Sequence, residues 1–159
     1  MKFFNYDDII ELEKLGKGGF GKVFKAYHKR KCKYVAIKEF LKPDEKKDNQ
    51  VQFNYEAFID SIIIEHSLLR DINKLSIENP EVKCFLGYDG IFKNPKDSMP
   101  ILQMESGFCT LFDVLRAGMK YSVPEALYVL NSLVDGYSLL QNKGICNRDV
   151  KTENIILVE

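Results

Sequence analysis

Residues 16–23 read GKGGFGKV, and residues in which apolar and polar side chains roughly alternate flank this glycine-rich stretch on both sides. The alternation runs from Ile9 to Leu15 before the glycines and from Lys22 to Tyr27 after them, as in strands with one buried face. We therefore interpret the glycines as the turn of a β-hairpin. A dinucleotide-binding βαβ unit would need a helix to begin at the glycines, and a strand follows them here.

Glycines of this kind let backbone N–H groups approach phosphate oxygens, because no Cβ stands between them. Taken alone, the stretch leaves two interpretations open: a phosphate-binding loop and an ordinary glycine-rich hairpin turn. A third strand is predicted at Tyr34–Phe40, and it carries Val35-Ala36-Ile37-Lys38. A lysine in a strand is usually a solvated side chain, so Lys38 does not decide between the two interpretations by itself.

The next segment predicts a long helix between two connections. Residues 42–48 are charged and contain a proline, which favours a solvated connection. Apolar residues then recur at three- and four-residue steps and form one helical face. They are Ile59, Ile62, Ile63, Leu69 and Ile72. Asn79-Pro80 marks the loop after the helix.

The last part of the chain predicts two strands followed by helices. We expect strands at Phe85–Tyr88 and Ile101–Glu105 and a short helix starting at Thr110. Ser122 and Glu125 fit a capping box, so a longer helix should start there and run to about Lys143.

The predicted helix after Ser122 is apolar over most of its circumference, so we expect it to be buried on several sides. One broad face is formed by Ala126, Leu127, Leu130, Leu133, Val134, Tyr137 and Leu140, and Tyr128, Val129 and Leu139 widen it. The residues that follow Lys143 are too few to cover this surface. We therefore expect the structure that covers it to lie outside this sequence.

The composition indicates one globular chain without a strong overall electrostatic field. The 159 residues are 45% apolar and 29% charged, with 23 basic and 23 acidic side chains. Balanced charge gives no general attraction to nucleic acid or to an anionic membrane, so we expect neither as a partner. Any anion site must be local.

The sequence also predicts an intracellular, cytoplasmic protein. Asp7 and Asp8 stand where a signal peptide needs apolar residues, and Lys2 stands where myristoylation needs glycine. No apolar run approaches the length of a membrane span. The cysteines are widely spaced without a C-x-x-C pair, which indicates neither a zinc site nor a redox dithiol. They are Cys32, Cys84, Cys109 and Cys146.

The most specific motif lies near the end of the chain. Residues 147–154 read NRDVKTEN, and the apolar run 155–158 follows them. This stretch resembles the H-R-D-x-K-x-x-N loop of protein kinases, whose G-x-G-x-x-G-x-V and V-A-I-K motifs match residues 16–23 and 35–38. The motifs occur in the family's order, and the resemblance covers nearly the whole chain.

The resemblance implies an α+β, protein-kinase-like fold. We expect a five-stranded antiparallel N-lobe sheet with one long helix, followed by the first helices and the catalytic loop of a helical C-lobe. Residues 1–159 would form an incomplete kinase domain, with the N-lobe at 1–105 and the hinge and start of the C-lobe at 106–159.

The resemblance also implies ATP and Mg²⁺ as cofactors and a protein carrying Ser or Thr as substrate. Lys38 would meet the α and β phosphates, with a glutamate of the long helix as its counter-ion. Glu65 and Glu56 compete for that role. We choose Glu65 because it lies within the apolar face, with Ile62 and Leu69 one turn away on either side.

The catalytic roles implied by the resemblance belong to the loop. Asp149 would orient the substrate hydroxyl and accept its proton, and Lys151 would stabilise charge on the γ-phosphoryl group. Asn154 would ligate a magnesium ion. A lysine at position 151 is typical of the serine/threonine branch, and tyrosine specificity is the alternative.

The remaining nucleotide contacts follow from the same resemblance. The phosphates would lie under the glycines Gly16, Gly18 and Gly21. The adenine slot would be lined by Leu15, Val23, Ala36 and Ile156, with Met104 as gatekeeper. The Glu105 carbonyl and the Gly107 N–H would meet the adenine edge. Packing in a hydrophobic core would explain the apolar character of the residues assigned to the adenine slot equally well.

The sequence departs from the family pattern in two places. Asn147 replaces the usual histidine, and we expect the loop to be looser for it. No Asp-Phe-Gly occurs in residues 1–159. The aspartate of that motif, which in the family bridges magnesium to the β and γ phosphates, is thus absent, and we expect little transfer from this polypeptide alone. Two other hypotheses stay open: a nucleotide-binding pseudokinase or scaffold, and an unrelated nucleotide-binding fold with chance matches.

Overall fold

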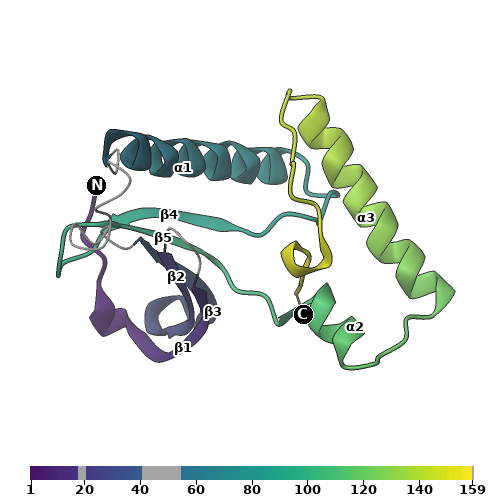
Figure 1. The fold of residues 1–159 in the computed structure, drawn as a ribbon, viewed down its shortest axis with the longest axis horizontal. Coiled ribbons are helices and arrows are strands. Elements are labelled where there is room, and N and C mark those ends of the chain that lie inside the picture. The colour runs from purple at the N-terminus through teal and green to yellow at the C-terminus, as the bar shows by residue number, and fades with distance from the viewer. Residues whose placement is uncertain (18–20, 41–54, 159) are drawn as a thin grey trace, which may run out of the picture. The chain divides into compact units, whose positions relative to one another are not determined.

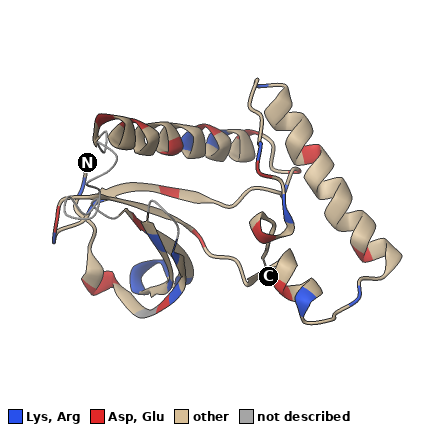
Figure 2. Cartoon of the chain, viewed as in Figure 1, with Lys and Arg blue, Asp and Glu red and all other residues tan. Residues whose placement is uncertain are grey.

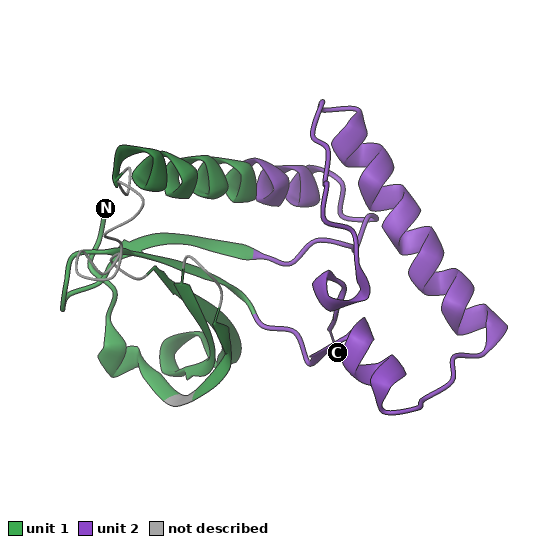
Figure 3. Ribbon diagram, in the orientation of Figure 1, with its two compact units in different colours: residues 1–70, 88–105 green, residues 71–87, 106–159 purple. Residues whose placement is uncertain are grey.

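The computed structural model describes residues 1–17, 21–40 and 55–158. The predicted charged connection at 42–48 and the predicted phosphate contact Gly18 lie outside the described residues. The chain forms two compact units, shown in Figure 3: residues 1–70 with 88–105, and residues 71–87 with 106–159. The division after Glu105 falls where the sequence predicts a lobe boundary, but residues 71–87 group with the second unit.

Unit 1 is built on a five-stranded antiparallel sheet with the order β1-β2-β3-β5-β4 (Figure 1). The strands are β1 (Ile9–Lys17), β2 (Gly21–His28), β3 (Lys33–Phe40), β4 (Tyr88–Lys93) and β5 (Pro100–Glu105). A single turn of 3-10 helix, η2 (Lys29–Lys31), joins β2 to β3. The helix α1 (Tyr55–Glu78) begins in unit 1 and ends in unit 2. The predicted sheet and long helix are confirmed.

The two faces of the sheet form two apolar clusters, because successive side chains of a strand point to opposite faces. One cluster contains Phe4, Ile9, Ala26, Val35, Ile37 and Ile101. The other joins the sheet to α1 and contains Phe40, Phe58, Ile62, Met99 and Leu102. Burying the apolar face of α1 in this second cluster fixes which helix residues point at the sheet.

The strand predicted at Phe85–Tyr88 is wrong, because β4 begins where that prediction ends. The sequence Asp89-Gly90 has the composition of a turn, and it marks the end of a strand in most contexts. In the structure Gly90 has a positive φ of 134° and lies at a shift in the pairing of β4 with β5. Glycine absorbs this β-bulge, so the strand continues through it.

An N-terminal strap, residues 2–8, covers one face of the sheet and has no counterpart among the predicted elements. Phe3 forms a parallel bridge with Lys93, and the Phe4 N–H donates to the Lys93 carbonyl at 2.8 Å. The Phe4 ring meets Tyr6 and Phe92 edge to face, at centroid distances of 4.9 and 5.7 Å. The strap thus adds a fifth backbone pairing, at the β4 edge, to the four pairings that join the five strands.

The strap also reaches β3. The Tyr6 hydroxyl donates a hydrogen bond to the Glu39 carboxylate, next to Lys38 in sequence. Burial, followed by this hydrogen bond and the negative charge of Glu39, raises the pKa of Tyr6 above its ordinary value. A single 3-10 turn, η1 (Tyr6–Asp8), leads from the strap into β1, and the side chain of Asn5 caps it.

Unit 2 contains the helices α2 (Leu111–Arg116) and α3 (Val123–Gln141) and a 3-10 turn, η3 (Thr152–Asn154). A two-stranded antiparallel sheet joins β6 (Cys109–Thr110) to β7 (Ile156–Leu157). Thr110 and Ser122 each form a capping box, with Asp113 and Glu125 as the reciprocal partners. Both predicted helix starts are confirmed, and α3 ends close to the predicted Lys143.

Helix α3 leaves much of its apolar surface exposed. Leu127, Tyr128, Leu130 and Val134 are 50%, 70%, 54% and 52% exposed, whereas Gly136 and Leu140 are buried. Its charged residues are Glu125 and Asp135, seen as the red segments on this helix in Figure 2. The burial on several sides that the sequence predicts for this helix is therefore not supplied within unit 2. None of the helices in the described ranges has the length and apolar character needed to cross a bilayer.

The different burial of two residues of the strap predicts how much each contributes to the free energy of unfolding. Phe4 is 5% exposed and Phe3 is 62% exposed, so the two neighbouring phenylalanines form a matched pair. Phe4→Ala should lower the free energy of unfolding by about 3 kcal/mol, because it removes a core aromatic ring. Phe3→Ala should cost less than about 1 kcal/mol, since that ring makes only a surface contact with Lys93. Denaturant unfolding of both variants measures the difference; equal losses would contradict this account of the strap.

Candidate functional site

Lys38 and Glu65 form an ion pair between β3 and α1. The Lys38 Nζ lies 2.5 Å from Oε1 of Glu65, and the two side chains are 24% and 35% exposed. The ammonium also lies 5.0 Å from the centre of the Phe40 ring. The carboxylate and the aromatic face replace part of the hydration that the partly buried ammonium loses.

The packing of α1 explains why Glu65, and not Glu56, meets Lys38. Ile62 lies one turn before Glu65 and is 1% exposed, and Leu69 lies one turn after it and packs on the same cluster. Side chains at these spacings share one helix face, so Glu65 is carried toward the sheet. Glu56 is exposed in the first turn of the helix. The choice made from the sequence agrees with the structure.

Tyr88 at the start of β4 supports the same region of α1. Its hydroxyl lies 2.7 Å from Nδ1 of His66, the residue after Glu65. Burial, and after it the negative charge of Glu65, raises the pKa of Tyr88 to about 12. The phenol therefore stays neutral and hydrogen-bonded at physiological pH, and it ties the helix to the sheet beside the ion pair.

The register of the sheet places four predicted nucleotide contacts on one face. Val23 is paired with Lys38, and Ala36 is paired with Met104. Directly opposed residues in antiparallel strands point to the same face, and Ala36 and Lys38 are two residues apart, so all four share it. Leu15 is 54% exposed and lies at a shift in the pairing of β1 with β2.

The two described glycines of the hairpin have different surroundings. A Cβ added to Gly16 would meet nothing within 4 Å, whereas one added to Gly21 would overlap the Glu39 carbonyl oxygen. Gly21 is therefore required by the close approach of β3, whatever it binds. Gly16 leaves open space beside its backbone, as a phosphate-binding loop requires.

In unit 2, Gly107 and Ile156 lie against each other. A Cβ added to Gly107 would overlap Cγ2 of Ile156 and would lie 3.0 Å from the Leu157 carbonyl oxygen. The Phe108 N–H donates to that same carbonyl at 2.7 Å. The β6–β7 pairing thus brings the segment after Glu105 next to the strand that follows the catalytic loop. The contacts of Glu105 and Gly107 with an adenine edge stay predictions.

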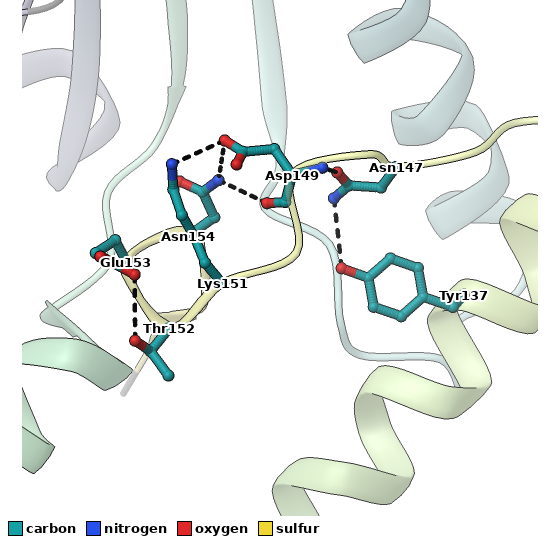
Figure 4. A network of polar contacts seen from close by, with 7 residues as sticks. All are labelled: Tyr137, Asn147, Asp149, Lys151, Thr152, Glu153 and Asn154. Atoms are coloured by element: carbon teal, nitrogen blue, oxygen red, sulfur yellow. Dashed lines mark hydrogen bonds and ion pairs between the residues drawn. The ribbon is translucent and has the colours of Figure 1, made fainter.

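The predicted catalytic residues of unit 2 form one polar network, drawn in Figure 4. The Asp149 Oδ2 lies 3.0 Å from Nζ of Lys151 and accepts a 2.8 Å hydrogen bond from Nδ2 of Asn154. The same Nδ2 donates to the Asp149 carbonyl at 2.8 Å. The 3-10 turn η3 makes this possible, because it folds Asn154 back over Asp149.

Both partners favour the ionised form of Asp149. Hydrogen bonding from Lys151, and then from Asn154, lowers the pKa of this carboxyl below its ordinary value. The Asp149 side chain is nevertheless 69% exposed in this unit. The site therefore presents a carboxylate, an ammonium and an amide to solvent.

The donor set fits a magnesium ion only in part. The amide nitrogen of Asn154 donates both of its hydrogen bonds to Asp149. The Oδ1 atom of Asn154 takes part in neither bond, so it is the atom that could serve as an oxygen ligand. Among the residues that the structure describes, no group of three or more His, Cys, Asp or Glu side chains could hold a metal ion. Mg²⁺ keeps several waters and takes phosphate oxygens as ligands, so one or two protein oxygens suffice when a nucleotide supplies the rest.

The predicted site residues therefore fall into two groups. Lys38, Glu65 and the sheet face of Val23, Ala36 and Met104 belong to unit 1. The Asp149 network and the Gly107–Ile156 contact belong to unit 2. Each group is brought together within its own unit.

Sequence reasoning missed three supports of these groups. They are the His66–Tyr88 hydrogen bond, the β6–β7 pairing, and the contact of Asn147 with Tyr137 on α3. The first joins residues far apart in sequence and has no local signal. A signal existed for the second, since apolar residues 155–158 form a short strand-like run. For the third, the sequence shows that Asn147 replaces a histidine, but nothing in it marks Tyr137 as the partner.

Comparison with known proteins shows which family has a similar sequence. The protein kinase domain model matches residues 9–159. The interferon-induced, double-stranded RNA-activated protein kinase of Mus musculus is 30% identical over 167 residues, covering 96% of this chain and 28% of that protein. The serine/threonine-protein kinase PSK1 of Saccharomyces cerevisiae is 28% identical over 155 residues, covering 96% of this chain and 11% of that protein.

A solved kinase domain has the same fold. It superposes with a TM-score of 0.72 at 21% identity, over 96% of this chain and 40% of its own length. The chain thus spans well under half of each of these relatives. The strap before Ile9 lies outside the family match.

The polar network predicts how the pKa of Asp149 responds to the loss of Lys151. Lys151→Met should raise the pKa of Asp149 toward its ordinary value, because the largest stabilisation of the carboxylate is removed. The contribution of this ion pair to stability is present above the unfolded-state pKa and is lost as the pH falls through the lower folded-state pKa. Carbon NMR of the Asp149 carboxyl follows both variants. Lys143→Met, in the same unit before the loop, serves as a control that should leave the pKa unchanged; an equal shift in both would refute the assignment.

Proposed function

Because this chain belongs to the protein kinase family, we propose that it binds ATP with Mg²⁺ and serves transfer of the γ-phosphoryl group to a serine or threonine hydroxyl of a protein. The observation that carries the proposal is the Asp149–Lys151–Asn154 network, which gathers a carboxylate, an ammonium and a side-chain amide within one loop. The Lys38–Glu65 ion pair supports it from the other unit.

Lys38 binds the α and β phosphates in this proposal. Glu65 holds the ammonium in place, so that little reorganisation is needed when a polyanion arrives. The apolar side chains of Val23, Ala36 and Met104, which share one sheet face with Lys38, offer the adenine ring an apolar surface. Gly16 leaves its backbone accessible to phosphate oxygens.

Asp149 orients the attacking hydroxyl and accepts its proton as the new O–P bond forms. Lys151 stands 3.0 Å from that carboxylate, where it can also meet the negative charge of the transferring group. Asn154 supplies an amide oxygen to magnesium. When bound, the ion neutralises charge on the phosphates, and the residues of the loop place the hydroxyl.

The choice of serine and threonine over tyrosine rests on Lys151. The lysine two residues after Asp149 is typical of the serine/threonine branch of the family. One relative is named as a serine/threonine-protein kinase. A short aliphatic hydroxyl must approach the loop closely, and a lysine beside the carboxylate suits a compact group.

Two substitutions separate nucleotide positioning from proton acceptance in the natural full-length polypeptide. Lys38→Met should lower kcat/KM for phosphoryl transfer by about 100-fold or more, because it removes a preorganised charge from the phosphates. Asp149→Asn should lower kcat by about 10²- to 10⁴-fold and leave ATP affinity within a small factor, because the amide cannot accept the proton. ADP release that depends on a serine- or threonine-containing protein measures transfer, and calorimetric titration measures ATP binding.

Lys33→Met provides the matched control, because Lys33 lies on β3 with a 46% exposed side chain, 3.9 Å from Asp89. It should leave transfer nearly unchanged. Full transfer by Asp149→Asn would overturn the proposal. Tight ATP binding by the wild type without any transfer would favour a binding-only pseudokinase or scaffold, and transfer to tyrosine peptides alone would overturn the serine/threonine assignment.

A further inference from the structure

We infer that Asn147 is a positioning residue, which ties the backbone of Asp149 to helix α3 and so sets the direction of the catalytic carboxylate. This inference rests on the proposed function. The sequence alone predicts a looser loop at Asn147, where the family has histidine. In the structure the Asn147 amide makes two hydrogen bonds, one with each of its polar atoms.

The first bond acts on the backbone. The Asp149 N–H donates to Oδ1 of Asn147 at 2.9 Å. An asparagine that accepts from the N–H two residues later forms an Asx-turn, which restricts the two peptide units between them. The Cα–Cβ bond of Asp149 therefore leaves the backbone in a defined direction.

The second bond acts between elements. The Asn147 Nδ2 donates to the Tyr137 hydroxyl at 3.3 Å, as Figure 4 shows. Tyr137 lies in a fixed part of α3: its neighbour Gly136 is buried and Leu140 is 5% exposed. A Cβ added to Gly136 would overlap Sγ of Cys84, so the helix is closely packed at this turn. The phenol is thus a stable anchor.

The two bonds tie the loop to α3 on the side of Asn147, whereas the Leu111 N–H, which donates to the Ile155 carbonyl at 2.8 Å, ties its other end to the start of α2. Lys151 and Asn154 bind Asp149 from within residues 149–154, so they order the loop internally and could move with it as a body. The amide of Asn147 instead connects that body to α3. Because its two polar atoms are used at the same time, one side chain transmits the position of the helix to the backbone of Asp149.

This role predicts an effect on the chemical step and not on nucleotide binding. Tyr137→Phe removes only the hydroxyl, and should lower kcat about fivefold, the value of one net hydrogen bond, with KM for ATP within twofold. Asn147→Ala removes both bonds and should lower kcat further. Asn147→Ser keeps a short side-chain acceptor for the Asp149 N–H but cannot reach Tyr137, so it should resemble Tyr137→Phe.

Tyr128→Phe is the control, because Tyr128 lies on the same helix with 70% exposure. It should leave kcat and KM unchanged. Thermal unfolding of each variant shows whether it is folded, and Tyr137→Phe keeps the ring and thus the packing if Asn147→Ala proves unstable.

Amide hydrogen exchange of Asp149 gives a readout that needs no phosphoryl transfer. Exchange at Asp149 should be about fivefold faster in Tyr137→Phe and faster still in Asn147→Ala, with exchange in the middle of α3 unchanged. Faster exchange together with a lower kcat and a constant KM supports the inference. If the wild type transfers no phosphoryl group, the proposed function fails and exchange alone decides this inference. Unchanged exchange at Asp149 in both variants overturns it, as does an equal kcat loss in Tyr128→Phe.

Discussion

The Lys38–Glu65 ion pair sets the condition that the rest of unit 1 has to meet. A half-buried ammonium is stable only beside a carboxylate, and here that carboxylate comes from a different element. The strand must present Lys38 on the same face as Ala36, and the helix must present Glu65 on the face that carries Ile62. Both periodicities, two for the strand and 3.6 for the helix, are satisfied by one apolar cluster between α1 and the sheet. The hydrophobic packing of the strand and the helix therefore meets the condition set by the ion pair, because one cluster positions both charged side chains.

Patterns that are local in sequence predicted the elements well, and pairings between distant residues were missed. Alternation of apolar and polar residues predicted β1 and β2, and the capping box of Ser122 and Glu125 predicted the start of α3. The strand β4 was misplaced because Asp89-Gly90 has turn composition, while the sheet uses Gly90 for a bulge. The strap was missed because its strand character comes from a parallel bridge to Lys93, and such a bridge leaves no periodic pattern in three residues.

The residues of the candidate site also divide into those that local sequence patterns predict and those that depend on partners distant in sequence. Asp149, Lys151 and Asn154 are close in sequence, so a single 3-10 turn is enough to assemble them, and the motif predicts the group. Glu65 could be chosen from its apolar neighbours on the helix. The role of Asn147 could not be predicted in this way, because the sequence shows only that asparagine replaces the family's histidine. Its partner Tyr137 is ten residues away on α3 and lies within the apolar face predicted there, where nothing marks its hydroxyl as an anchor.

The pKa of Asp149 bears on what the carboxylate does. A strong general base would need a raised pKa, and the hydrogen bonds from Lys151 and Asn154 lower it. These bonds therefore reduce the driving force for removing a proton from a hydroxyl in the ground state. They are compatible with a loose phosphoryl-transfer transition state, in which the attacking oxygen needs little deprotonation before bond formation. In that chemistry the main task of the carboxylate is to hold the hydroxyl in line, and direction matters more than basicity. The role proposed for Asn147 concerns this direction, because its side-chain Oδ1 accepts the hydrogen bond from the backbone N–H of Asp149.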